Sequence, residues 1–90
     1  MNRQLYIDSS TYVLGAICFE TEHDIPTGKV FRVSGSKYQE TAKSIVEIIE
    51  ANEYTSIVLF GGETEKLEAF LRDAGLEEEV EIQIKRENGE

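Results

Sequence analysis

Hydrophobic and polar side chains alternate near the start of the chain, where Leu5 and Ile7 are separated by Tyr6. A period of two is typical of a β-strand with one buried face. This strand should end at Asp8, because the serines that follow it favour a turn. Residues 12–19 are almost all apolar or small, which predicts a second strand that is covered on both faces.

A hairpin loop of moderate length should connect the second strand to the third. Residues 20–28 contain several residue types that favour turns, namely His23, Asp24, Pro26 and Gly28. Residues 30–33 then form the returning strand. Two later strands are expected, one in the unbroken apolar run 57–60 and one at 80–85, where apolar and mostly charged residues alternate as in an edge strand.

Two other segments have the 3.6-residue period of amphipathic helices. In the first, five apolar positions fall on one stripe: Tyr38, Ala42, Ile45, Val46 and Ile49. Ser36 and Gln39 match a capping box at the start of this helix. In the second, Thr64 is the expected N-cap, residues 67–74 supply the stripe, and Gly75 provides a left-handed stop.

The element order is therefore β-β-β-α-β-α-β, and the fold class is α/β. Ninety residues allow a single domain, because so short a chain can build only one small core. We assign residues 1–86 to this domain and expect residues 87–90 to form a frayed acidic tail. A core of this size gains from burying further apolar surface, which favours a homodimer.

Charge and composition narrow the range of functions. Eighteen acidic residues against nine basic ones give a formal charge of −9, which repels a phosphate backbone and disfavours nucleic acid as a ligand. The apolar runs are far too short to cross a membrane. Cys18 is the only cysteine, and the first residues do not look like a secretion signal, so we expect a cytoplasmic protein. An acidic domain can bind a protein partner through complementary charge.

The segment Leu5-Tyr6-Ile7-Asp8-Ser9-Ser10-Thr11 resembles the first-strand signature of the ribonuclease H-like superfamily. In that signature, apolar residues are followed by Asp, a small residue, and Ser or Thr. Together with the element order, the resemblance covers nearly the whole chain. It implies a ribonuclease H-like domain with a mixed five-stranded sheet.

Nucleases of this superfamily hold divalent metal with the first-strand Asp, an acid from the first helix and another acid at the end of the fourth strand. The resemblance implies that Asp8 is the metal ligand here, and that Asp8, Glu40 and Glu63 would form the catalytic set with Mg or Mn. Glu40, however, lies about 160° from the centre of the apolar stripe of its helix, at about 100° per residue. The fourth strand ends in Phe60-Gly61-Gly62, where the nucleases carry Asp.

This incomplete acid set predicts a catalytically degenerate module without a cofactor, which acts through a protein partner or a small ligand. A metal-dependent nuclease is the alternative, so whether the protein is an enzyme stays open. A third hypothesis is nucleotide or phosphate binding, because the Asp-Ser-Ser-Thr and Gly-Gly turns are similar to phosphate loops of the sugar kinase, heat-shock protein and actin class.

In each binding hypothesis the site is built from two loops that follow strands. The carboxyl ends of strands are the general binding place in open α/β sheets, and glycines let a ligand approach the backbone there. The candidate residues are Asp8, Ser9, Ser10 and Thr11 in the first loop, and Gly61, Gly62 and Thr64 in the second.

Three other features have a simpler interpretation. His23 has no second His or Cys at metal-ligand spacing, so we expect no zinc site there. Cys18 lies in an apolar strand and should be a buried small hydrophobe rather than a nucleophile. The run of glutamates at 77–79 follows the helix stop, and acidic runs are usually solvated surface.

Overall fold

The computed structural model describes residues 3–10 and 14–85. Within these residues it contains five strands and two helices in the predicted β-β-β-α-β-α-β order. The elements are β1 (Arg3–Asp8), β2 (Gly15–Glu22), β3 (Ile25–Ser34), α1 (Tyr38–Ala51), β4 (Ser56–Phe60), α2 (Thr64–Asp73) and β5 (Glu81–Ile84). The predicted tail, the beginning of the segment predicted as the second strand, and Thr11 lie outside the described residues.

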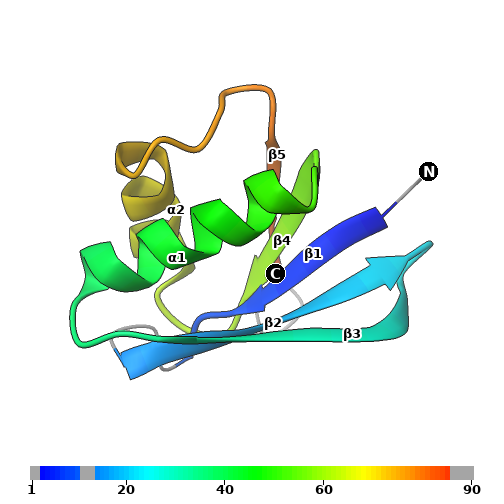
Figure 1. Cartoon of the computed structure of the whole chain (residues 1–90), viewed down its shortest axis with the longest axis horizontal. Helices are drawn as coiled ribbons and strands as arrows, with labels where there is room; N and C mark the ends of the chain where they lie inside the picture. The colour runs from blue at the N-terminus through cyan, green and yellow to red at the C-terminus, as the bar shows by residue number, and fades with distance from the viewer. Residues whose placement is uncertain (1–2, 11–13, 86–90) are drawn as a thin grey trace.

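The five strands form one mixed sheet in the order β3-β2-β1-β4-β5 (Figure 1). The first three strands are an antiparallel meander. β4 then pairs parallel with β1, and β5 pairs parallel with β4. Parallel neighbours require crossover connections, and α1 and α2 supply them. The predicted mixed five-stranded sheet is confirmed, with β5 at an edge as expected.

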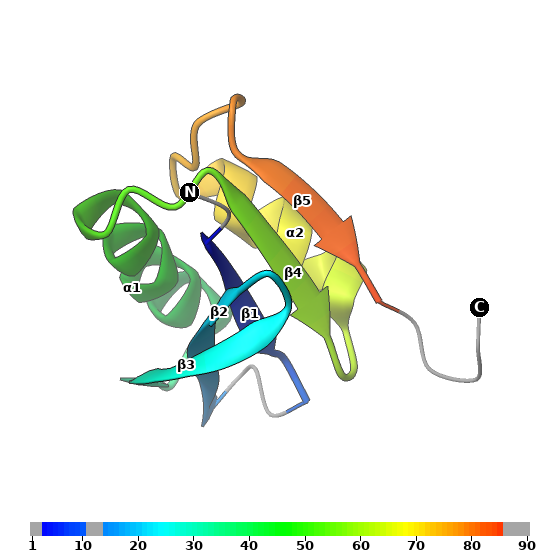
Figure 2. The same cartoon turned by 90° about the vertical axis from the view of Figure 1, so that its right-hand side faces the viewer.

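Both helices lie on the same side of the sheet, where they enclose one core (Figures 1 and 2). Helix stripe residues such as Ala42 and Ile45 are fully buried there, together with Leu5 and Ile7 of β1. Tyr38 stacks on Phe70 with ring centroids 5.4 Å apart, which joins the two helices. None of the helices in the described part of the chain is long and apolar enough to cross a membrane.

The predicted loop at residues 20–28 is wrong, because β2 and β3 continue through most of it. Only His23 and Asp24 remain in the turn, with φ values of 55° and 66°. Two positive φ angles give the tight turn whose twist matches that of paired strands. The hydroxyl of Tyr6 on β1 donates to Asp24 Oδ1 at 3.1 Å and ties this turn to the sheet.

The helix starts also differ from prediction. The N-cap of α1 is Lys37, without a side-chain cap, and Ser36 does not pair with Gln39 as a capping box. Glu40 takes this role, because its Oε1 accepts hydrogen bonds from the backbone N–H of Ser36 at 3.1 Å and from its hydroxyl at 3.0 Å. Thr64 is the first residue of α2 rather than its N-cap, which is Glu63.

Candidate functional site

Asp8 ends β1 beside the end of β4, where its register partner is Phe60. The side chain is half-buried. Its Oδ1 accepts a hydrogen bond from the backbone N–H of Ser10 at 3.0 Å. The aspartate therefore shapes the turn that follows its own strand, as short polar side chains often do.

Gly61 lies against this turn from the β4 side. Its φ is 95°, a conformation that L side chains rarely adopt. A Cβ atom at this position would be 2.8 Å from Asp8 Oδ1 and 3.0 Å from the backbone nitrogen of Ser10. Glycine is thus required both by the backbone angle and by the close approach of the two loops. Gly62 meets no such neighbour within 4 Å.

Ser9 joins the same two loops and is completely buried. Its backbone N–H donates to the Phe60 carbonyl at 2.9 Å. Its hydroxyl lies 2.9 Å from that carbonyl oxygen and also contacts the carbonyl oxygen of Gly62. Because one hydroxyl has one proton, the two carbonyl groups share it. Thr64, also buried, begins α2 directly after this turn.

The two loops predicted as a binding site are therefore adjacent in space. Asp8, Ser9 and Ser10 contact Gly61, Gly62 or Phe60 through the hydrogen bonds and close approach described above. The other two predicted acids have different partners. Glu40 is exposed on the first turn of α1, where the Ser36 hydrogen bonds hold its pKa below the usual value. Oε2 of Glu63, the N-cap of α2, lies 3.4 Å from Nζ of Lys66 in the first turn of that helix.

The predicted metal set does not form a metal-binding group. Among residues 3–10 and 14–85, no group of three or more His, Cys, Asp or Glu side chains is placed to hold a metal ion. His23 is exposed in the hairpin turn. Cys18 is fully buried, and burial raises the pKa of its thiol to about 12, so it has little thiolate character.

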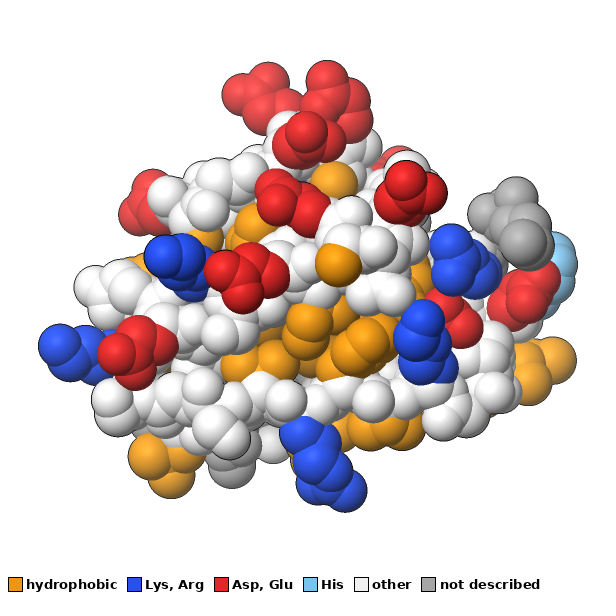
Figure 3. Space-filling view, viewed as in Figure 1, with side chains coloured by type: hydrophobic (Ala, Val, Ile, Leu, Met, Phe, Trp, Pro, Cys, Tyr) orange, Lys and Arg blue, Asp and Glu red, His pale blue; other side chains and the backbone are white. Residues whose placement is uncertain are grey.

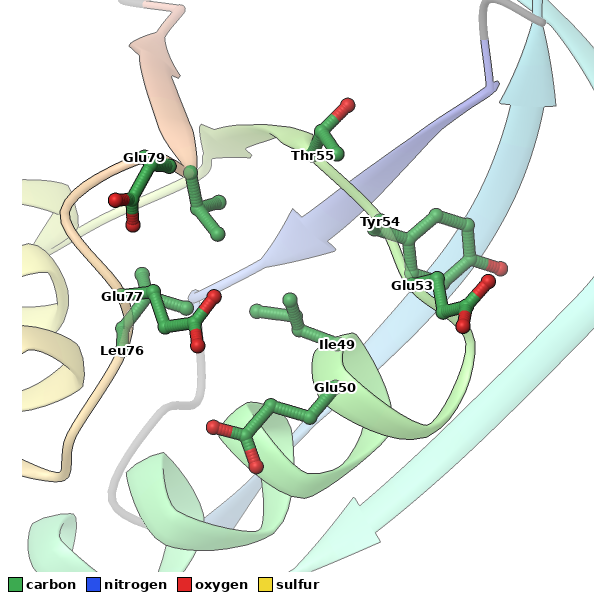
Figure 4. A pocket seen from close by; sticks show the side chains of 9 residues that line it. Ile49, Glu50, Glu53, Tyr54, Thr55, Leu76, Glu77 and Glu79 are labelled. Carbon is green, nitrogen blue, oxygen red and sulfur yellow. The ribbon is translucent and has the colours of Figure 1, made fainter.

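A pocket that sequence reasoning missed lies at the opposite end of β4, before its first residue. Its volume is about 470 Å³. Apolar residues Ile49, Tyr54, Leu76 and Val80 and the acidic residues Glu50, Glu53, Glu77 and Glu79 line it (Figure 4). Acidic side chains also gather on this part of the space-filling surface (Figure 3). The sequence shows these acidic residues. It does not show that the segments around the α1–β4 and α2–β5 connections bring them together at one pocket.

A second missed feature is an aromatic cluster on the face of the sheet away from the helices. Tyr6 stacks on Phe19 at a centroid distance of 5.3 Å, and Phe60 lies within 6.3 Å of both rings. The three rings come from β1, β2 and β4. Strand alternation places each ring on this face, but only the strand order brings them together.

No known protein family and no curated protein matches this sequence. Solved structures do match the fold. A mutant of the large terminase subunit of bacteriophage Sf6, with calcium, superposes with a TM-score of 0.70 at 10% identity, covering 96% of this chain and 38% of that one. The nuclease domain of the same subunit, with manganese, gives a TM-score of 0.67 at 10% identity and the same coverage. This chain thus spans well under half of the terminase chain.

Proposed function

We propose that this domain, which has a ribonuclease H-like fold, is a catalytically degenerate binding module that acts through a protein partner. The observation that carries the proposal is that, among residues 3–10 and 14–85, Asp8 is the lone acid at the adjoining ends of β1 and β4. Asp8 lies there beside Phe60 and Gly61, while Glu40 bonds to Ser36 and Glu63 pairs with Lys66. A hydrolytic centre of the two-metal kind needs several carboxylates that converge on the ions.

The residues present do not fit such a metal group. The similar terminase structures are described with manganese or calcium, but the described residues of this chain offer no three-ligand cluster. One carboxylate oxygen of Asp8 also accepts the hydrogen bond from the Ser10 N–H. The proposed function therefore includes no metal-dependent step, and nuclease activity with Mg or Mn is the alternative that the assay below tests.

Hydrogen bonding in the first of the two loops favours a protein partner over a phosphate or nucleotide. An anion site of this kind needs free backbone N–H groups that point to the ligand. The N–H of Ser9 already donates to the Phe60 carbonyl, and that of Ser10 to Asp8. The Ser9 hydroxyl is likewise occupied and buried. A phosphate at the Asp8–Ser10 loop would have to break these bonds before it could bind there.

The direct test is a nuclease assay on RNA–DNA hybrid, single strands and junctions, with Mg²⁺ or Mn²⁺. We compare the wild type with Asp8→Asn, and use Asp73→Asn, an exposed acid on α2, as the matched control. We expect no cleavage above background in all three. Robust cleavage that is lost in Asp8→Asn but kept in Asp73→Asn would overturn the proposal and establish the nuclease.

A thermal shift assay tests the remaining hypothesis, which is phosphate or nucleotide binding at the two loops. A ligand that binds only the native state raises the unfolding temperature in proportion to the logarithm of its excess over Kd. We expect inorganic phosphate and ATP at millimolar concentration to leave the midpoint unchanged. A rise that disappears in Ser10→Pro, which removes one loop N–H, would support phosphate or nucleotide binding instead.

A further inference from the structure

The face of the sheet away from the helices carries its side chains in three rows that run across the strands. The middle one, here called the apolar row, follows the register Val30, Phe19, Tyr6, Val58, Gln83. The second, the cationic row, contains Arg32, Ile17, Asp8 and Phe60 and is continued at the β5 edge by Lys85. The third, the polar row, contains Pro26, Thr21, Gln4, Ser56 and Glu81.

Two contacts with Tyr6 show that Lys85 and Asp24 reach this side of the sheet. Lys85 places its Nζ 5.2 Å from the centroid of the Tyr6 ring. The Tyr6 hydroxyl reaches in the other direction and donates to Asp24 in the hairpin turn, beside the polar row. The two cations and Asp8 thus lie on one side of the apolar row, and Asp24 and Glu81 lie on the other.

Part of this face is both apolar and exposed. Val30 is 53% exposed and Ile17 45% exposed, and they border the aromatic cluster. Neither helix covers this face (Figure 2). A contiguous apolar surface with a charged border is typical of a protein interaction site, whereas single exposed apolar residues are ordinary.

We propose that a second copy of this chain packs on this face, about a two-fold axis that runs across the strands along the apolar row. The rotation places the apolar row of one copy on the apolar row of the other copy. It also places the cationic row over the polar row of the partner, so that Lys85 faces the partner's Glu81, while Arg32 faces the partner's Pro26, two residues from the Asp24 turn. The face is therefore complementary to itself in charge as well as in apolar character. Packed sheets of this kind lie about 10 Å apart.

The distribution of charge supports this location for a self-contact. The chain carries a net charge of −9, so two copies repel each other at long range. The proposed face holds two cations, Arg32 and Lys85, against three acids, Asp8, Asp24 and Glu81, and is close to neutral. Most of the acid excess lies on other surfaces. Added salt should therefore strengthen the dimer, because it screens the long-range repulsion.

Sedimentation equilibrium of the full chain tests the inference. We expect a reversible dimer that tightens as salt is raised, and at least a tenfold weaker dimer in Val30→Glu. Ile25→Glu is the matched control, because Ile25 is an exposed residue of the same strand, 67% exposed, outside the three rows. A wild type that stays monomeric up to about 1 mM, or a Val30→Glu variant that associates like the wild type, would overturn the proposal.

A charge exchange tests the axis itself. Lys85→Glu alone should weaken the dimer, because it faces the partner's Glu81, and Glu81→Lys alone should weaken it as well. The double variant restores both pairs and should regain most of the lost affinity. Single variants without effect, or a double variant no better than the worse single one, would contradict this arrangement. The measurement does not depend on nuclease activity, so it can fail or succeed independently of the proposed function.

Discussion

The hydroxyl of Tyr54 donates a hydrogen bond of 2.8 Å to Oε2 of Glu20, linking the segment after α1 to β2. The same carboxylate accepts hydrogen bonds from Arg3 at 3.1 Å and from the Thr27 hydroxyl at 2.7 Å. Glu20 is only 7% exposed. A buried carboxylate requires such partners, and here three donors from separate segments satisfy it.

This network predicts a large stability loss in Glu20→Gln. The amide keeps one acceptor but turns two N–H donors toward side chains that are themselves donors. We expect the free energy of unfolding to fall by about 1–3 kcal/mol in urea titration. Glu47→Gln, an exposed residue of α1, is the control and should change stability by less than about 0.5 kcal/mol. Equal losses in both variants would show that the network adds nothing.

The same carboxylate predicts a pH dependence. The hydrogen bond from Thr27, then that from Tyr54, holds the pKa of Glu20 below its ordinary value of 4.5. A lowered pKa in the folded state means that the unfolded chain binds the proton more readily. The stabilisation is therefore complete above pH 4.5 and is lost as pH falls through the lower folded pKa.

Urea titrations of wild type and Glu20→Gln at several pH values measure this contribution. The difference in unfolding free energy between them should be constant at neutral pH and shrink below pH 4.5. A difference that grows on acidification would reverse the sign and contradict the assignment. Tyr54→Phe removes one donor to Glu20 without changing ring size. In this background, the effect of Glu20→Gln on the unfolding free energy should be smaller than in the wild type.

The sequence predicted the features that follow from periodicity and chain order. Asp8 and Gly61 are neighbours because Asp8 ends β1 and Gly61 follows β4, and these two strands pair in parallel. The topology rules leave few architectures for this element order, and the resemblance to the ribonuclease H-like superfamily implies this one. The alternation of β1 correctly separated Leu5 and Ile7 from Tyr6. Both outcomes depend on patterns that many residues share, namely the alternation along a strand and the order of the elements.

Features set by one or two side chains could not be predicted in the same way. Ser36 has acceptors three and four residues ahead, and the helix uses Glu40 rather than Gln39 because α1 begins one residue later than a Ser36 cap requires. The pair His23-Asp24 lacks the glycine that usually marks a two-residue hairpin turn, so the sequence predicts a longer loop there. The contact between Tyr54 and Glu20 joins residues 34 positions apart and leaves no local pattern.

Glu63→Gly should raise stability slightly. Glu63 has a φ of 58° at the start of α2, and a left-handed conformation costs a residue with a Cβ about 1–2 kcal/mol. Glycine relieves that cost, while the exposed pair with Lys66 contributes little. Thermal unfolding should show a midpoint equal to or above that of the wild type. A clear fall would indicate that the Glu63 side chain has a structural role that its contacts do not show.

Gly61→Ala should destabilise the candidate site, whereas Gly62→Ala should not. An alanine Cβ at position 61 would lie 2.8 Å from Asp8 Oδ1, at a φ of 95°, so the two loops must separate or the backbone must shift. We expect a loss of about 1–3 kcal/mol for Gly61→Ala and a change within about 0.5 kcal/mol for Gly62→Ala.

Amide NMR shows whether that loss arises at the loops. The chemical shift of the Ser10 N–H, which donates to Asp8, should change strongly in Gly61→Ala and stay the same in Gly62→Ala. Only the first substitution places a Cβ against this hydrogen bond. Similar shifts in both variants would mean that the turn tolerates a side chain at either position. The close approach of Gly61 to Asp8 would then not be what holds the two loops together.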